Sequence, residues 1–169
     1  MKINVPLQAG FLPDRYTKHA DAANKVGTYP VVSFPIEFQE VPSEAASLAV
    51  TLLDPDSIPV CGFEYIHWVV ANLDPQLTEL PADASQSGAV AMTYGNNSLA
   101  GGLLHVTDQQ LNRHYLGPTP PDQPHHYRLT VYALDQKLAL PDGFWLNQLE
   151  SKLPGHVLAT ATAILPVKN

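Results

Sequence analysis

The stretch that decides the fold is residues 54–72, DPDSIPVCGFEYIHWVVAN, in which a cluster of Asp and Pro precedes a histidine and an apolar run. A second stretch repeats this order at residues 117–134, GPTPPDQPHHYRLTVYAL. Proline fixes φ and cannot donate to a sheet ladder, so both clusters predict rigid turns that place a histidine at the rim of a sheet. Binding residues are often held at such rims by the scaffold behind them.

Length and composition predict one domain over residues 1–169, of the mainly β class. A chain of 169 residues with 45% hydrophobic content is long enough to bury about two-thirds of its unfolded surface around one core. Its 16 prolines and 10 glycines are spread along the chain, which favours short strands joined by turns over a bundle of long helices.

The charge balance argues against two classes of partner. The net charge is −7 with only nine Lys and Arg residues, whereas nucleic-acid binding and adsorption to anionic membranes both need a basic surface. No stretch approaches the roughly 20 apolar residues of a membrane span, and the N-terminal residues lack the apolar run of a signal peptide. Cys61 stands alone, which excludes an intramolecular disulfide. We therefore expect a cytoplasmic protein without stable membrane insertion.

Alternating apolar residues and β-branched runs predict the strands. In residues 47–53, Leu48, Val50 and Leu52 alternate on one side, which is typical of a half-buried strand. The expected strands cover residues 29–38 (in one or two pieces), 47–53, 69–73, 129–134 and 156–165, with a further short strand at 89–92.

One helix is expected, over residues 143–153, with Asp142 as its N-cap and Pro154 at its end. The connections at 74–88 and 94–124 are long and rich in Asn, Gly and Pro. Loops of this length in a compact domain are usually functional or mobile.

The two-residue period of a strand sorts the candidate site residues by face. His125 shares a face with Tyr127 and His126 shares the other with Arg128, so only one histidine of the pair enters a given pocket. In the first stretch the same rule places Tyr65, His67, Val69 and Ala71 on one face and Trp68, Val70 and Asn72 on the other.

Two carboxylates, Asp54 and Asp56, flank a proline at the end of strand 47–53 and are expected to point toward His67. A carboxylate that accepts a hydrogen bond from an imidazole favours the charged ring. We therefore expect the pKa of His67 to lie above its usual value of about 6.5.

Other site chemistries fit the sequence less well. It has no G-x-S-x-G elbow for a serine hydrolase, no H-x-E or H-E-x-x-H pair for zinc, and no phosphate-loop lysine in the glycine-rich residues 95–102. Cys61 has no recognisable triad and is expected to be packed rather than nucleophilic. We expect no metal and no cofactor, and we predict that residues 95–102 form a flexible loop.

Residues 33–38 (SFPIEF), 54–56 (DPD) and 67–73 (HWVVANL) form one block, and residues 115–127 (YLGPTPPDQPHHY) form a second. These blocks, in this order, resemble the two signatures of the phosphatidylethanolamine-binding protein family, which includes the Raf kinase inhibitor proteins. The resemblance is to the bacterial type and covers residues 33–169.

The resemblance implies a β-sandwich of antiparallel sheets with one or two peripheral helices and a small anion-binding pocket at one end. Asp56 belongs to the same Asp-Pro-Asp cluster as the first pocket residue and is a further candidate. The positions that match the pocket of the family are Asp54, Tyr65, His67, Pro121, His125 and Tyr127.

We predict a non-catalytic binding module whose pocket takes a small anionic or phosphorylated group: a phospholipid headgroup, a nucleotide fragment or a phosphorylated side chain. In this hypothesis His67, His125 and Tyr127 donate hydrogen bonds, and Asp54 orients an imidazole or accepts from a ligand ammonium. A zwitterionic headgroup would satisfy both signs of charge. Family analogy adds a kinase or protease as a regulated partner, and the sequence leaves a homodimer open.

Two rival hypotheses remain. A small hydrolase would use His67 or His125 as general base with Asp54 as orienter, although no nucleophile is visible. A partner-binding protein would instead act through residues 96–114, and substituting the pocket histidines would then leave partner binding intact.

Overall fold

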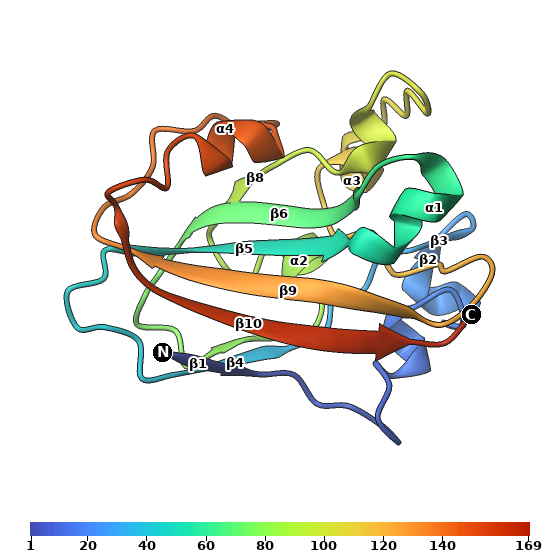
Figure 1. Ribbon diagram of the computed structural model, residues 1–169, viewed down its shortest axis with the longest axis horizontal. Helices are drawn as coiled ribbons and strands as arrows, with labels where there is room; N and C mark the ends of the chain where they lie inside the picture. Colours follow the sequence, from blue (N-terminus) through green and yellow to red (C-terminus); the bar gives the residue numbers. More distant parts are fainter.

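Strand β5 (Ser47–Asp54) is the centre of the fold, and every one of its residues is buried. The computed structural model describes residues 1–169 (Figure 1). β5 pairs in antiparallel fashion with β9 (His125–Leu134) on one side and with β6 (Tyr65–Leu73) on the other. Strands β10 (Val157–Val167) and β8 (Thr93–Tyr94) complete a five-stranded sheet in the order β10-β9-β5-β6-β8.

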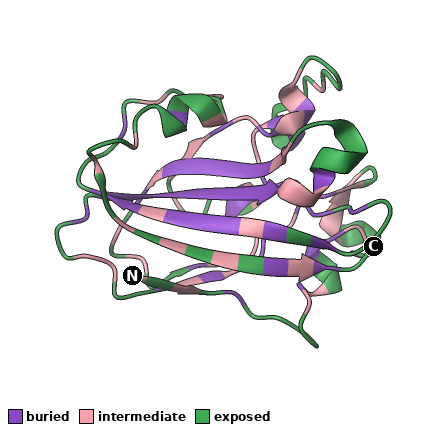
Figure 2. Ribbon diagram, in the orientation of Figure 1, coloured by how far each residue is buried: buried purple, intermediate pink, exposed green.

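A second antiparallel sheet packs against the first. Its strands, in the order β1-β4-β7, are β1 (Lys2–Asn4), β4 (Ile36–Gln39) and β7 (Glu79–Leu80), and a separate ribbon pairs β2 (Lys25–Val26) with β3 (Tyr29–Pro30). Both sheets contribute to the largest core cluster, which holds 22 buried residues (Figure 2). The expected antiparallel β-sandwich is therefore confirmed.

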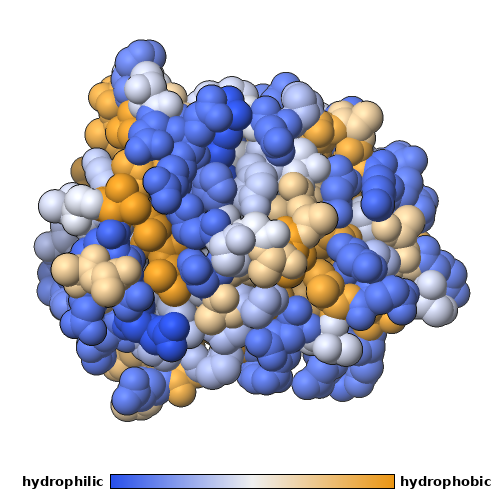
Figure 3. Space-filling model, turned by 180° about the vertical axis from the view of Figure 1, so that it is seen from behind, coloured by the Kyte–Doolittle hydropathy of each residue, from blue (hydrophilic) through white to orange (hydrophobic).

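The helices are peripheral and short, and there are more of them than the one or two expected. The α-helices are α1 (Ile58–Cys61), α2 (Ala84–Ser87), α3 (Gln109–Asn112) and α4 (Leu146–Glu150), and single 3-10 turns lie at Asp14–Tyr16, Ala22–Asn24, Pro55–Ser57 and Ser98–Ala100. The additional helices arise because the connection between β5 and β6 and the two long connections each close into a short helical turn. No helix is long and apolar enough to cross a membrane. Seen from behind, the surface carries separate hydrophobic patches among hydrophilic side chains (Figure 3).

The predicted helix over residues 143–153 is present but shorter, because α4 begins only after Trp145. Asp142 is not its N-cap: the carboxylate accepts a hydrogen bond from the backbone N–H of Tyr94 at 2.9 Å. Gly143 has a φ of +81°, which no α-helix accommodates. Leu149 is fully buried against the outer face of the five-stranded sheet, so the helix packs on a sheet as predicted.

The prediction that residues 47–53 form a half-buried strand is wrong about burial. Leu48, Val50 and Leu52 belong to the largest cluster, between the sheets, whereas Ala49 belongs to a second cluster of seven residues that includes Leu149 of α4. Both faces of β5 are buried because α4 and the preceding connection cover the outer face of the sheet.

The other predicted strands are found with shifted limits. Residues 29–38 contain β3 and the start of β4, while β6, β9 and β10 are each longer than predicted. Residues 89–92 are not a strand, and the pairing begins one residue later, where Thr93 and Tyr94 of β8 lie opposite Ala71 and Val70 of β6.

A β-bulge in β6 overturns the predicted division of its side chains between two faces. Leu52 lies opposite Trp68 and Leu53 lies opposite Ile66, so His67 is an extra residue in the ladder. As a result Trp68 packs in the core between the sheets, and the ring of His67 contacts Tyr127 of that same core at 4.9 Å between centroids. Val69 lies in the opposite cluster, under α4, and not beside His67 as predicted.

Candidate ligand-binding site

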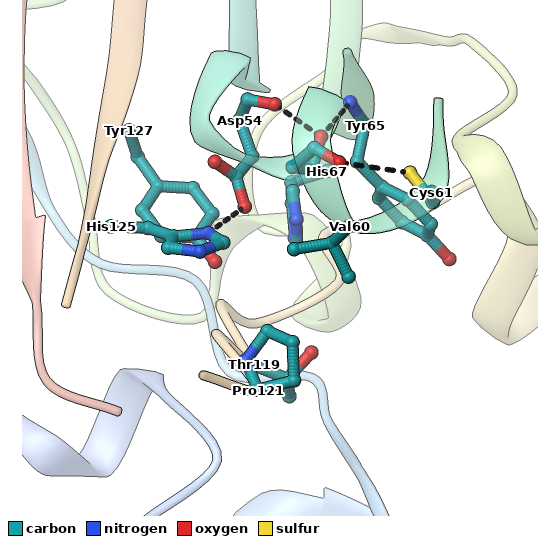
Figure 4. A pocket seen from close by; sticks show the side chains of 10 residues that line it. Asp54, Val60, Cys61, Tyr65, His67, Thr119, Pro121, His125 and Tyr127 are labelled. Atoms are coloured by element: carbon teal, nitrogen blue, oxygen red, sulfur yellow. Dashed lines mark hydrogen bonds and ion pairs between the residues drawn. The ribbon is translucent and has the colours of Figure 1, made fainter. Parts of the chain in front are cut away.

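The two proline-containing stretches meet at one end of the five-stranded sheet. Asp54 ends β5 opposite Tyr65 at the start of β6, and β9 begins beside them at His125. A cavity of about 190 Å³ opens at this end, with side chains of β5, β6 and β9 on one side and Thr119 and Pro121 on the other (Figure 4). Its lining consists of Asp54, Ser57, Val60, Cys61, Tyr65, His67, Thr119, Pro121, His125 and Tyr127.

The Asp-Pro-Asp cluster forms a helical turn rather than an extended one. Pro55 begins a 3-10 turn that runs directly into α1. The hydroxyl of Ser57 donates to the carbonyl oxygen of Asp54 at 2.6 Å and accepts from the backbone N–H of Tyr65 at 2.9 Å. This hydroxyl therefore ties the end of β5 to the start of β6 and fixes the separation of the two strands at the cavity.

His125 is held by carboxylates at both ring nitrogens. Nδ1 lies 2.8 Å from Oδ2 of Asp54 and Nε2 lies 3.0 Å from Oδ1 of Asp122, while only 1% of the His125 side chain is exposed. Burial opposes a charge on the ring, but the hydrogen bonds and charges of Asp54 and Asp122 outweigh burial and raise the pKa of His125. A carboxylate at each ring nitrogen thus favours the charged ring, which donates from both nitrogens.

His67 has the opposite electrostatic character, and the prediction of a raised pKa is wrong. Its partner is the backbone carbonyl of Leu116, 2.9 Å from Nδ1, and not Asp54. Burial lowers the pKa of His67 to about 4, although the Leu116 carbonyl and the charge of Asp54 act in the other direction. Because a carbonyl oxygen only accepts, Nδ1 carries the proton and Nε2 is left as an acceptor.

Two polar atoms beside the cavity are buried and have no hydrogen-bond partner: Oδ1 of Asp54 and the phenolic oxygen of Tyr127. Burial, followed by the nearby charge of Asp54, raises the pKa of Tyr127, so its hydroxyl stays protonated and can donate. Buried polar groups without partners are rare and are commonly explained by a functional role or by a bound water or ion.

The structure places the predicted site residues as follows. Asp54, Tyr65, His67, Pro121, His125 and Tyr127 all line the cavity. Asp56 lies outside it, because its carboxylate accepts from the backbone N–H of His126 at 2.8 Å and from the ring of His126 at 3.2 Å. His126 is exposed, in agreement with the division of β9 between two faces.

Four lining residues were not among the predicted site residues: Ser57, Val60, Cys61 and Thr119. Pro59 does not line the cavity. Cys61 is exposed rather than packed, with Sγ 3.3 Å from the carbonyl oxygens of Ser57 and Phe63. Val60 and Cys61 follow the Asp-Pro-Asp cluster closely in the sequence, which was the one indication that they belong to the site. The helical turn that brings them to the cavity was not predicted.

The segment 95–102 is folded rather than a flexible loop. Asn97 is fully buried, accepts from the backbone N–H of Leu99 and donates to the carbonyl oxygens of Leu111 and His114. Leu99 and Leu111 pack in a cluster that Tyr65 borders. This connection therefore supports one wall of the cavity.

Gly117 positions the second stretch, and we expect Gly117→Ala to lower the free energy of unfolding by about 1–3 kcal/mol through overpacking. A Cβ at this position would lie 2.5 Å from Cβ of Pro30 and 2.7 Å from the carbonyl oxygen of Tyr16. Urea denaturation measures the loss. Gly102→Ala is the matched control because a Cβ there meets nothing within 4 Å, and equal stability of the two variants would contradict the prediction.

No group of three or more His, Cys, Asp and Glu side chains is arranged to hold a metal ion. The polar groups of the cavity offer instead a mixture of hydrogen-bond acceptors, on Asp54 and His67, and a donor, on Tyr127.

The sequence matches the family model of the phosphatidylethanolamine-binding protein over residues 3–167. It is 46% identical over 158 residues to the uncharacterized protein YxkA of Bacillus subtilis, a match that covers 93% of this chain and 94% of that protein. A UPF0098 protein of Chlamydia muridarum is 39% identical over 133 residues, covering 77% of this chain and 78% of its own length.

Solved structures of the same fold cover nearly the whole chain. A crystal structure described as a phosphatidylethanolamine-binding protein homologue from Chlamydia trachomatis superposes with a TM-score of 0.78 at 26% identity and covers 99% of this chain and 97% of its own. E. coli YbcL superposes with a TM-score of 0.75 at 22% identity, and the match covers 99% of this chain and 98% of YbcL. At this identity the match supports the fold alone. By sequence and by fold, the chain belongs to the phosphatidylethanolamine-binding protein family.

Proposed function

We propose that the protein is a binding protein whose cavity takes a small phosphate-bearing group that also carries hydrogen-bond donors. The observation that carries this proposal is the set of free polar atoms at the cavity. Oδ1 of Asp54 is a buried acceptor and the hydroxyl of Tyr127 a buried donor, each without a hydrogen-bond partner, and Nε2 of His67 is an acceptor that makes no hydrogen bond within the protein. A zwitterion such as a phosphoethanolamine group supplies both, while a bare phosphate dianion supplies only acceptors.

The assignment of donors differs from the one predicted. Both nitrogens of His125 are already bonded to carboxylates, and the free nitrogen of neutral His67 accepts. Three residues were predicted to donate hydrogen bonds to the ligand. Of these, only Tyr127 has a donor that is not already bonded within the protein. An ammonium or hydroxyl group on the ligand could donate to the two free acceptors, Oδ1 of Asp54 and Nε2 of His67.

The size of the cavity limits the ligand to a small group. Its volume of about 190 Å³ is below the 300–1,000 Å³ typical of sites for drug-sized ligands. A phospholipid headgroup, the phosphate end of a nucleotide or a phosphorylated side chain would fit, with the rest of the molecule outside.

Binding is a better account of this geometry than hydrolysis. Three residues of nucleophile type line the cavity, Ser57, Cys61 and Thr119, and none of them is bonded to a histidine. Ser57 and Cys61 instead make hydrogen bonds to backbone carbonyls. A general base must lie within hydrogen-bond reach of the proton that it removes. Turnover of phosphoesters or esters that disappears in Cys61→Ser would contradict this proposal.

Isothermal titration with O-phosphoethanolamine tests the proposed ligand class. We expect Tyr127→Phe to weaken binding by about 1.5–3 kcal/mol, the usual worth of a hydrogen bond to a charged group. Tyr132→Phe is the matched control, because Tyr132 lies on the same strand but borders the cluster under α4.

Two outcomes would overturn the proposal: no binding of O-phosphoethanolamine to the unmodified protein, or equal losses in Tyr127→Phe and Tyr132→Phe. Titrations with ethanolamine alone and with inorganic phosphate show whether both halves of the zwitterion are needed.

We further propose that the protein works in the cytoplasm as a regulator, with a kinase or protease as its partner. Family analogy supports this role, and the cavity would then take a phosphorylated group of the partner. Loss of partner binding in Tyr127→Phe would support this proposal. Retention of partner binding would favour recognition through residues 96–114.

A further inference from the structure

Asp122 bonds the one ring nitrogen of His125 that the buried Asp54 leaves available. The Nδ1 side of the ring is bonded to buried Asp54, and the Nε2 side lies 3.0 Å from the carboxylate of Asp122. The two carboxylates differ in environment, because 4% of the Asp54 side chain is exposed and 54% of the Asp122 side chain is exposed. One partner of His125 is thus built into the core and the other lies in solvent.

The segment that carries Asp122 is exposed, whereas the segment before it is held by hydrogen bonds. Lys18 donates from its backbone N–H to the carbonyl oxygen of Pro118 at 2.8 Å and from its ammonium to that of Pro120 at 2.6 Å. Residues 121–124 are all exposed. Beyond the His125 contact, their bonds are local ones between the Asp122 carboxylate and the backbone of Asp122 and Gln123, and one from Asn169 to the carbonyl oxygen of Asp122. A small displacement after Pro120 would release the carboxylate from the ring.

We propose that the Asp122 carboxylate holds the place of a ligand oxyanion on Nε2 of His125, and that a phosphate group binds by exchanging with it. This inference rests on the proposed function and deepens it. The exchange breaks one charge-assisted hydrogen bond and forms another of the same kind on the same N–H. His125 keeps two anionic partners throughout, so no proton needs to enter or leave the ring.

The exchange makes Asp122 a residue that determines specificity. An oxyanion enters only if it binds His125 better than the internal carboxylate does, which selects against weak anions. The ligand phosphate then receives hydrogen bonds from His125 and from Tyr127, while Asp54 and His67 face the donor end of the ligand. Asp122 also places a negative charge beside His125 that repels an approaching phosphate.

The test is isothermal titration with inorganic phosphate at about pH 6, below the usual histidine pKa of about 6.5, where the Asp54 carboxylate still favours the charged form of the His125 ring in the Asp122 variants. We expect Asp122→Ala and Asp122→Asn to bind phosphate roughly three- to tenfold more tightly than the unmodified protein, because an internal competitor and a like charge are removed. Asp56→Asn is the matched control, because it also removes one aspartate charge. Asp56 bonds His126 and does not line the cavity.

Three results would overturn the exchange: unchanged phosphate affinity in the Asp122 variants, weaker binding in them, or an equal gain in Asp56→Asn, which would reduce the effect to net charge. Urea denaturation of each variant shows that it remains folded. The outcome is separable from the proposed function, because a gain in Asp122→Ala supports the exchange even if the unmodified protein does not bind O-phosphoethanolamine.

Discussion

Replacing Asp54 with alanine should lower the free energy of unfolding by about 3–5 kcal/mol, the usual effect of removing one partner of a buried ion pair. Asp54 and His125 are almost fully buried and lie 2.8 Å apart, so Asp54→Ala leaves a buried imidazolium without its nearer carboxylate. The ring then has to lose its proton, or to rely on the solvent-exposed Asp122 alone. Asp54→Asn should cost less, because an amide oxygen still accepts from Nδ1.

Urea denaturation at neutral pH measures these losses, and Asp56→Ala is the control. Asp56 carries the same charge two residues further on but pairs with exposed His126, so its removal should cost at most about 1 kcal/mol. An Asp54→Ala variant as stable as Asp56→Ala would show that the Asp54–His125 pair does not stabilise the fold.

The second large effect is a loss of stability in mild acid that depends on His67. In the unfolded chain this ring takes up a proton near its ordinary pKa of 6.5, whereas in the folded protein burial lowers the pKa to about 4. The stability is therefore complete above pH 6.5 and is lost as the pH falls toward 4. At about 1.4 kcal/mol per pH unit, the loss across this window is about 3 kcal/mol.

The other shifted groups near the site act outside this window. The raised pKa of His125 gives stability that is complete below 6.5 and is lost only as the pH rises through its folded value. At Asp122 desolvation opposes ionisation, but the hydrogen bond from His125, backbone hydrogen bonds and the His125 charge together outweigh it and lower the pKa, so its contribution is lost only in stronger acid. Between about pH 6.5 and 4.5 the slope thus reports on His67.

Urea denaturation between about pH 6.5 and 4.5 measures this slope, and His67→Asn is the decisive comparison. The asparagine amide can donate to the Leu116 carbonyl as Nδ1 does but does not titrate, so its stability should vary much less with pH. His126→Asn should keep the full slope, because its ring is exposed. A slope in the unmodified protein as shallow as that of His67→Asn would show that buried His67 does not stay neutral.

Most of the fold could be predicted from local sequence because its strands are marked locally. The β-branched and aromatic run at residues 129–134 predicts a strand, and the structure confirms it within the longer β9, together with the separation of His125 from His126. The resemblance named the residues that line the cavity, apart from Ser57, Val60, Cys61 and Thr119. The misplaced elements depended on distant partners: Asp142 bonds Tyr94 and so does not cap a helix.

The sequence by itself determined which side chains reach the end of the sheet, because strand period and proline placement are local properties of the chain. Only the tertiary structure decided how those side chains are paired and charged. Asp54 bonds His125, 71 positions away, rather than His67, because the register of β5 against β9 and the bulge in β6 place the rings. Burial then makes one histidine neutral and two carboxylates make the other positive, since both effects depend on neighbours that come together only in the folded protein.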